Sequence, residues 1–140
     1  MEFILPLCIM AFLNIFLIFR LLFLAGSFIK RRKIKLNQFQ LYDGEFPDKL
    51  QSARYQFQNM HEIPILFYLL CLIHINLNIY TQFDVNLAWG FVIFRFIHFL
   101  IRLQNQRDLS IRPRFLTFVL SLICLTIGWM NLFISTILAK

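Results

Sequence analysis

Four long apolar runs constrain this chain more strongly than any other feature of its sequence. They extend over about residues 3–29, 62–80, 87–101 and 115–138. The hydrocarbon core of a bilayer is about 30 Å thick, so a helix that crosses it needs about 20 predominantly apolar residues. Each run is apolar continuously instead of at every second position, which favours helices over a transmembrane barrel. The sequence therefore predicts an all-α integral membrane protein, a bundle of four transmembrane helices that forms a single domain over residues 1–140.

The composition supports a membrane protein and argues against a soluble enzyme. Apolar residues make up 59% of the 140-residue chain and the mean hydropathy is +0.68, which leaves little sequence for a soluble domain. The chain has no glycine-rich phosphate loop and no Ser/His/Asp arrangement. Cys71 and His74 form a lone Cys-x-x-His pair, which lacks the two further ligands of a zinc site. We therefore expect no bound metal, and we expect any chemistry to take place at the membrane.

The basic residues are distributed unevenly along the chain. Most of the lysines and arginines follow the first or the third apolar run, whereas the turn at 81–86 has none. By the positive-inside rule, the basic segments lie in the cytoplasm and both termini lie outside it. Contact with anionic headgroups explains these charges, so no nucleic-acid partner is expected. The basic residues of the two segments are Lys30, Arg31, Arg32, Lys33, Lys35, Lys49, Arg54, Arg102, Arg107, Arg112 and Arg114.

Four polar residues inside the apolar runs are the first candidates for a functional site. Asn59 and Glu62 lie at the head of the second run, and Arg95 and His98 lie within the third. An ionised side chain at the bilayer centre costs roughly 2.5–3.5 kcal/mol on insertion scales. Such groups therefore usually face the interior of a bundle or a water-filled cavity, where they mark functional sites.

The second run is preceded by a segment that is itself compatible with a helix. Pro47 and Asp48 are suited to open a helix, which then continues into the apolar run. Its polar residues fall at helical spacing on two adjoining faces. The first face carries Tyr55, Asn59 and Glu62, and the second carries Arg54 and Gln58. Pro64 frees a backbone carbonyl one turn earlier, which favours a kink beside these residues.

The third run carries a polar stripe on an otherwise apolar helix. The stripe consists of Arg95, His98, Arg102 and Asn105. Two interpretations follow. In the first, Glu62 and Arg95 form an interhelical ion pair and His98 is an ordinary buried histidine. In the second, the polar residues line an anion-accepting cavity that opens toward the cytoplasm, because guanidinium groups bind carboxylates in a bidentate manner.

Two short motifs resemble a known family. The second run begins with Asn-Met-His-Glu-Ile-Pro-Ile-Leu-Phe-Tyr at 59–68, and the third contains Arg-Phe-Ile-His at 95–98. Together with Ala88-Trp89 and a late Trp129, these motifs resemble the MAPEG proteins, the membrane-associated proteins in eicosanoid and glutathione metabolism, over nearly the whole chain. The similarity is greatest to the short bacterial members, which implies a multi-pass protein of the bacterial inner membrane. The resemblance further implies a homotrimer that binds glutathione between neighbouring subunits, at a site that faces the cytoplasm.

The resemblance also implies roles for particular residues. The candidates for glutathione binding are Asn59, Glu62, Arg95, His98, Arg54 and Gln58, with Arg20 as a weaker one. In the enzymatic relatives a catalytic arginine lies near the cytoplasmic end, between the third and fourth spans. The candidates for that arginine are Arg107, Arg112 and Arg114, and the sequence does not choose among them.

The activity implied by the resemblance is activation of the glutathione thiol. A thiol with a reference pKa of about 8.5 becomes a nucleophile near neutral pH when a cation stabilises the thiolate. Lowering that pKa by two units corresponds to about 2.7 kcal/mol, which a guanidinium can supply without a metal or a redox cofactor. The expected function is a membrane-bound glutathione transferase or peroxidase that acts on lipophilic electrophiles or lipid hydroperoxides. The alternative is a non-catalytic protein of the same fold that binds lipid or serves as a scaffold.

Overall fold

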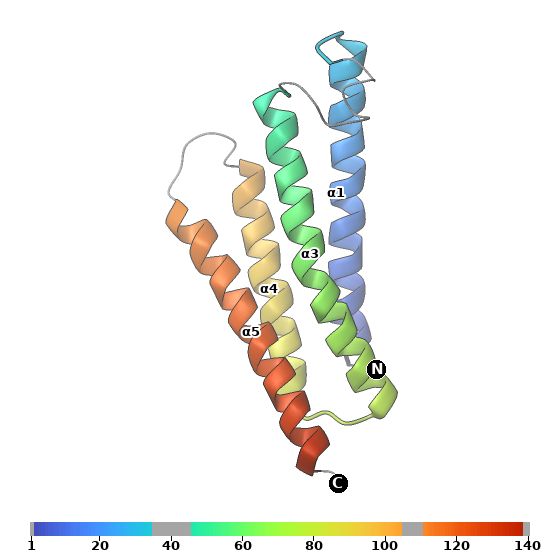
Figure 1. Cartoon of the computed structure of the whole chain (residues 1–140), viewed down its shortest axis with the longest axis vertical. Helices are drawn as coiled ribbons and strands as arrows, with labels where there is room; N and C mark the ends of the chain where they lie inside the picture. Colours follow the sequence, from blue (N-terminus) through green and yellow to red (C-terminus); the bar gives the residue numbers. More distant parts are fainter. Residues whose placement is uncertain (1, 35–45, 105–110, 139–140) are drawn as a thin grey trace.

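A computed structural model gives the arrangement of four long helices. It describes residues 2–34, 46–104 and 111–138. Within these ranges the helices are α1 (Ile4–Lys30), α3 (Asp48–Leu77), α4 (Gln82–Gln104) and α5 (Ile111–Leu138), which run alternately up and down (Figure 1). All four are long and apolar enough to cross a membrane. The prediction of an all-helical membrane protein with four spans is confirmed.

The helix boundaries follow local capping as well as hydropathy. Helix α3 begins at Asp48, directly after Pro47, as its sequence indicated, and it ends at Leu77 because Asn78 turns into the left-handed region with φ 53°. Helix α4 begins several residues before the expected apolar run. At its start, Asp84 accepts hydrogen bonds from the backbone N–H and the hydroxyl of Thr81, both at 2.8 Å. These bonds to the Asp84 carboxylate stabilise a polar first turn of α4. A mean hydropathy taken along the sequence does not reveal such a turn.

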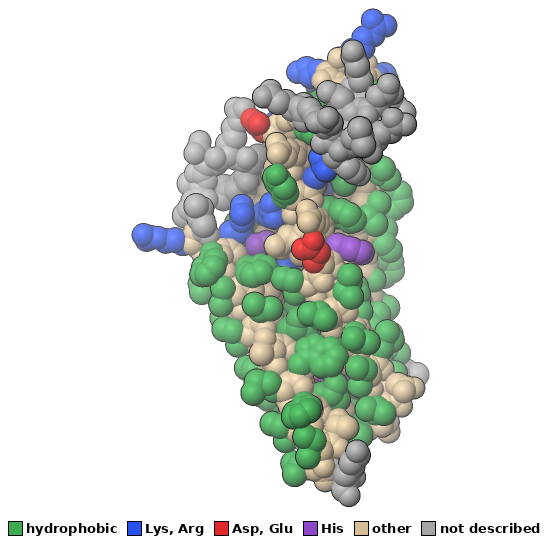
Figure 2. Space-filling model, viewed as in Figure 1, with side chains coloured by type: hydrophobic (Ala, Val, Ile, Leu, Met, Phe, Trp, Pro, Cys, Tyr) green, Lys and Arg blue, Asp and Glu red, His purple; other side chains and the backbone are tan. Residues whose placement is uncertain are grey.

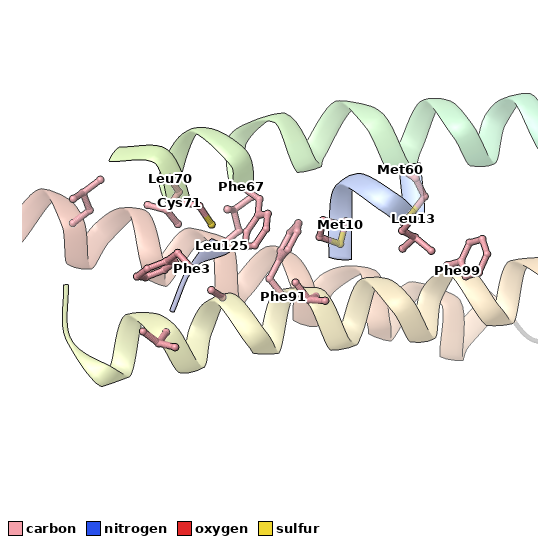
Figure 3. Close-up of a cluster of buried hydrophobic side chains, with 14 of the residues drawn as sticks. Phe3, Met10, Leu13, Met60, Phe67, Leu70, Cys71, Phe91, Phe99 and Leu125 are labelled. Atoms are coloured by element: carbon pink, nitrogen blue, oxygen red, sulfur yellow. The ribbon is translucent and has the colours of Figure 1, made fainter. Parts of the chain in front are cut away.

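Helix α3 contacts all three other described helices. It packs most extensively against α1, and it also contacts both members of the second close pair, α4 and α5. A continuous apolar cluster fills the space between the helices (Figure 3). In its middle, the ring of Phe67 stacks on that of Phe91 with centroids 4.4 Å apart. Labelled members of the cluster are Phe3, Met10, Leu13, Met60, Phe67, Leu70, Cys71, Phe91, Phe99 and Leu125.

Charged side chains gather at one end of the bundle. Figure 2 shows the lysines and arginines of the visible face near the end where the α1–α3 and α4–α5 connections lie, above a largely apolar lower part. The two chain ends lie toward the opposite end (Figure 1). The described basic residues of the two segments therefore lie toward the same end of the bundle (Figure 2). The assignment of that end to the cytoplasm stays a prediction.

One polar contact joins α4 to α5 near the end of the bundle where the chain ends lie (Figure 1). Asp84 on α4 is buried and accepts a hydrogen bond of 2.6 Å from the side-chain amide of Asn131 on α5. Because the same carboxylate also caps α4 through Thr81, a single side chain fixes both the start of α4 and its contact with α5.

Gly128 permits a close approach between α5 and α3. A Cβ atom at this position would lie 2.9 Å from Cδ2 of Leu70, closer than real Cβ atoms come to a neighbour. We expect Gly128→Val to lower the free energy of unfolding by roughly 1–3 kcal/mol, the usual cost of overpacking a close contact. The matched control is Gly26→Val on α1, because a Cβ there meets nothing within 4 Å. Unfolding in detergent, followed by circular dichroism, measures both. Equal losses in the two variants would contradict the close approach.

Candidate functional site

A polar cavity lies where α3, α4 and α5 meet. Its volume is ≈ 370 Å³, and it is open to its surroundings. One face of α3 supplies most of its wall at helical spacing, while α4 and α5 each add one arginine. The lining residues are Tyr55, Gln58, Asn59, Glu62, Arg102 and Arg114. We call this space the polar cavity.

The polar cavity contains charges of both signs. Arg102 is half-buried, and its Nη1 donates a 3.4 Å hydrogen bond to the backbone carbonyl of Tyr55. Arg114 and Glu62 are exposed. The Glu62 carboxylate accepts a 2.9 Å hydrogen bond from the side-chain amide of Gln58, one turn earlier on the same helix. The cavity therefore offers two guanidinium groups, one carboxylate and the amides of Gln58 and Asn59 to a ligand.

Arg95 lies behind the wall of the polar cavity and is fully buried. Its Nη1 donates a 3.1 Å hydrogen bond to the side-chain oxygen of Asn59. The guanidinium carbon also lies 5.5 Å from the ring centre of Phe91 and 5.1 Å from that of Phe118, which offsets part of its desolvation. Its Nε and Nη2 have no hydrogen-bond partner in the part of the chain that the structure describes.

The predicted ion pair between Glu62 and Arg95 is wrong. Arg95 bonds to Asn59, and Glu62 bonds to Gln58, within the ranges 2–34, 46–104 and 111–138. The reason lies in the rotation of α3 about its axis. Asn59 is turned inward to α4, whereas Glu62 lies at the exposed edge of the same face and keeps its hydration.

His98 joins α4 to the beginning of α5 and does not line the polar cavity. Its ring Nδ1 donates a 3.0 Å hydrogen bond to the backbone carbonyl of Arg114, and the hydroxyl of Thr117 is 3.4 Å from the same nitrogen. The ring is buried. His98 thereby fixes the backbone of Arg114, whose side chain reaches the cavity.

The remaining candidates lie at different places. Arg54 borders a neighbouring cavity of ≈ 260 Å³, whose wall also includes Gln58, and its guanidinium lies 5.1 Å from the ring centre of Phe46. Arg112 is exposed and is not among the residues that line the polar cavity. Arg107 lies outside the described residues. Arg20 donates a 2.5 Å hydrogen bond to the side-chain oxygen of Gln56.

Two residues that shape this region, Arg102 and Gln56, were not predicted as site residues from the sequence. Arg102 belongs to the polar stripe of the third run, so its helical spacing from Arg95 was the available signal. Gln56 is buried and connects three helices, because it accepts from Arg20 and its Nε2 donates a 3.4 Å hydrogen bond to the backbone carbonyl of Phe99. No sequence pattern marks Gln56, since several other polar residues, Gln51 and Gln58 among them, stand near it.

Comparison with known proteins supports one family. The family model described as "MAPEG family" matches residues 7–134, which is nearly the whole chain. Comparisons with curated proteins and with solved structures give no match.

Proposed function

Because this chain belongs to the MAPEG family, whose members are membrane proteins of glutathione and eicosanoid metabolism, we propose that it is a glutathione transferase or peroxidase. Its second substrates are lipophilic electrophiles or lipid hydroperoxides that enter from the bilayer. The observation that carries the proposal is the set of charges in the polar cavity, which matches the charges of glutathione.

Glutathione presents two carboxylates, one ammonium group and a thiol. In the proposed complex Glu62 pairs with the ammonium group and Arg102 grips one carboxylate in bidentate fashion. Asn59 and Gln58 serve the peptide groups, since each amide both donates and accepts. A neighbouring subunit of the proposed homotrimer supplies the partner for the second carboxylate. Arg95 lies behind the wall of the polar cavity, and its hydrogen bond holds the side chain of Asn59 in place.

Of the two candidate catalytic arginines that the structure describes, Arg112 and Arg114, we assign the catalytic role to Arg114. It lines the polar cavity, and its backbone is anchored by the buried ring of His98. A guanidinium held beside the thiol stabilises the thiolate and makes it a nucleophile near neutral pH. With an electrophile, the thiolate forms a C–S bond, and a leaving group departs or the adduct takes up a proton. With a hydroperoxide, the thiolate attacks the terminal oxygen and breaks the O–O bond, which gives a sulfenic acid and the alcohol; a second glutathione converts the sulfenic acid to the disulfide and water. This chemistry requires neither a metal nor a redox cofactor.

The proposal also covers the assembly of the protein and its orientation in the membrane. We propose a homotrimer in the bacterial inner membrane, with both termini outside the cytoplasm and the polar cavity on the cytoplasmic side. Two observations support this arrangement. The polar cavity is open along one side, and it lies toward the end of the bundle where the basic segments gather.

Glu62→Gln is expected to weaken glutathione binding about tenfold, a change of about 1.4 kcal/mol. The substitution removes the one negative charge among the described residues that line the polar cavity. Isothermal titration of the purified protein with glutathione measures this change. The matched control is His61→Gln, since His61 is exposed, does not line the cavity and stacks on Phe57. An unchanged affinity in Glu62→Gln would place the ammonium group elsewhere.

A second candidate function is the non-catalytic, lipid-binding one. It is favoured by an apolar groove of ≈ 410 Å³ between α1 and α4, which we call the α1–α4 groove. The groove is lined by Ile9, Phe12, Leu13, Phe16, Phe96, Phe99 and Leu103. A lipid-binding scaffold would retain lipid in detergent and ignore glutathione, whereas the enzyme binds glutathione whether or not lipid is present.

A further inference from the structure

Two arginines lie close in sequence to residues of the α1–α4 groove, without lining it themselves. Arg20 follows the groove residue Phe16 by one turn of α1, and Arg102 precedes the groove residue Leu103 on α4. The guanidinium of Arg20 is held in place through Gln56, which is bonded in turn to the backbone carbonyl of Phe99 in the groove wall. The guanidinium of Arg20 is therefore a fixed cation near one end of the apolar α1–α4 groove.

Neither arginine has a counter-charge in the described residues. Arg20 bonds to the neutral amide of Gln56, and Arg102 bonds to the backbone carbonyl of Tyr55. The charges of Arg20 and Arg114 both repel that of Arg102. Partly buried cations within membrane-spanning helices are costly without a partner, so an anion at this place would be bound strongly.

The depth of the two arginines suits a lipid headgroup. At about 1.5 Å per residue, Arg20 lies about 24 Å along the helix axis from Ile4, and Arg102 lies about 30 Å from Gln82. The hydrocarbon core is about 30 Å thick, so both guanidinium groups reach the boundary between acyl chains and headgroups. An anion that enters from the bilayer carries its charge at this level.

We propose that the α1–α4 groove binds an anionic phospholipid, with one acyl chain in the groove and the phosphate at Arg20. The planar guanidinium of Arg20 matches a phosphate in bidentate geometry. A volume of ≈ 410 Å³ lies at the lower end of ligand pockets, so it accepts one acyl chain and leaves the second in the bilayer. The site does not depend on the proposed enzyme function, because Arg20 does not line the polar cavity.

The test is lipid retention by the full-length protein. The protein is reconstituted in vesicles of equal parts phosphatidylglycerol and phosphatidylcholine, extracted in mild detergent and examined by native mass spectrometry. We expect one phosphatidylglycerol per chain, retained over phosphatidylcholine by about fivefold. Both lipids carry a phosphate, but the choline of phosphatidylcholine adds a cation that the guanidinium of Arg20 repels.

Three variants separate the headgroup site from the groove. Arg20→Gln should bring the preference down to the ratio in the vesicles, whereas Arg20→Lys should keep most of it, because the charge remains. Ile9→Trp fills part of the groove and should lower retention of both lipids with Arg20 intact. The matched control is Arg31→Gln, an exposed basic residue at the same end of α1, which should leave the preference unchanged. If Arg20→Gln does not fold, Arg20→Lys and Ile9→Trp decide the question.

Four results would overturn the proposal. The first is equal retention of the two lipids by the natural protein. The second is a preference that survives in Arg20→Gln, which would assign it to the basic loops. The third is displacement of phosphatidylglycerol by oleate added at equal amount, which would make the ligand a free fatty acid. The fourth is cross-linking of two copies through Phe12→Cys in the groove, which would make its occupant a second chain.

Discussion

Replacing Asn59 with leucine is expected to lower the free energy of unfolding by about 3 kcal/mol and to abolish glutathione binding. The amide oxygen of Asn59 is the one hydrogen-bond acceptor that Arg95 has in the described ranges, and Arg95 is fully buried. A hydrogen bond to a charged group contributes about 1.5–3 kcal/mol, and its loss leaves the guanidinium desolvated without compensation. Unfolding of the purified protein by sodium dodecyl sulfate measures the loss of stability.

Asn59→Asp is the matched control for this prediction. It retains an acceptor for Arg95 and adds a negative charge, so we expect a stability close to that of the natural protein. Glutathione binding should still weaken, because the aspartate no longer donates a hydrogen bond into the polar cavity. A leucine variant as stable as the natural protein would show that Arg95 does not depend on Asn59.

Replacing Arg114 with glutamine is expected to reduce glutathione-dependent turnover at pH 7 about 25-fold. Without the guanidinium the thiol pKa returns toward its reference value, and a shift of two units corresponds to about 2.7 kcal/mol. At pH 7 the fraction of thiolate then falls about 25-fold, from about three quarters at a pKa of about 6.5 to about 3% at a pKa of about 8.5. Ultraviolet absorbance of the bound thiolate and the rate with a model electrophile should decrease together. Glutathione affinity should change much less, because Arg102 and Glu62 remain.

The control for Arg114→Gln is Arg112→Gln. Both arginines are exposed near the beginning of α5, but only Arg114 lines the polar cavity. Turnover by Arg112→Gln should therefore stay within about twofold of that of the natural protein, a change of less than 0.5 kcal/mol. The opposite pattern would assign thiol activation to Arg112. If neither variant loses turnover, thiol activation would be assigned to Arg107, which lies outside the described residues.

The overall architecture and one face of the site were predictable from the sequence. Continuous apolar runs of spanning length leave the chain little choice but helices, since lipid offers no partner for backbone groups. Helical spacing then placed Tyr55, Asn59 and Glu62 on one face of α3, and these residues do share the wall of the polar cavity. Periodicity is reliable here because it depends only on neighbours along one helix.

Contacts between helices were less predictable. The spacing of residues on α3 and α4 does not fix how each helix is rotated, so charge alone indicated Glu62 as the partner of Arg95. The structure selects Asn59. The role of Gln56 depends on three helices at once, and the early start of α4 depends on a cap between Thr81 and Asp84. Neither arrangement leaves a pattern in hydropathy.

The central claim is that the polar cavity between α3, α4 and α5 binds and activates glutathione. The most direct test is a calorimetric titration of the detergent-purified protein with glutathione, with the ultraviolet absorbance of the thiolate recorded on the same sample. We predict saturable binding together with a thiolate signal that disappears in Arg114→Gln. Absence of binding by a folded natural protein would contradict the claim and would favour the lipid-binding function.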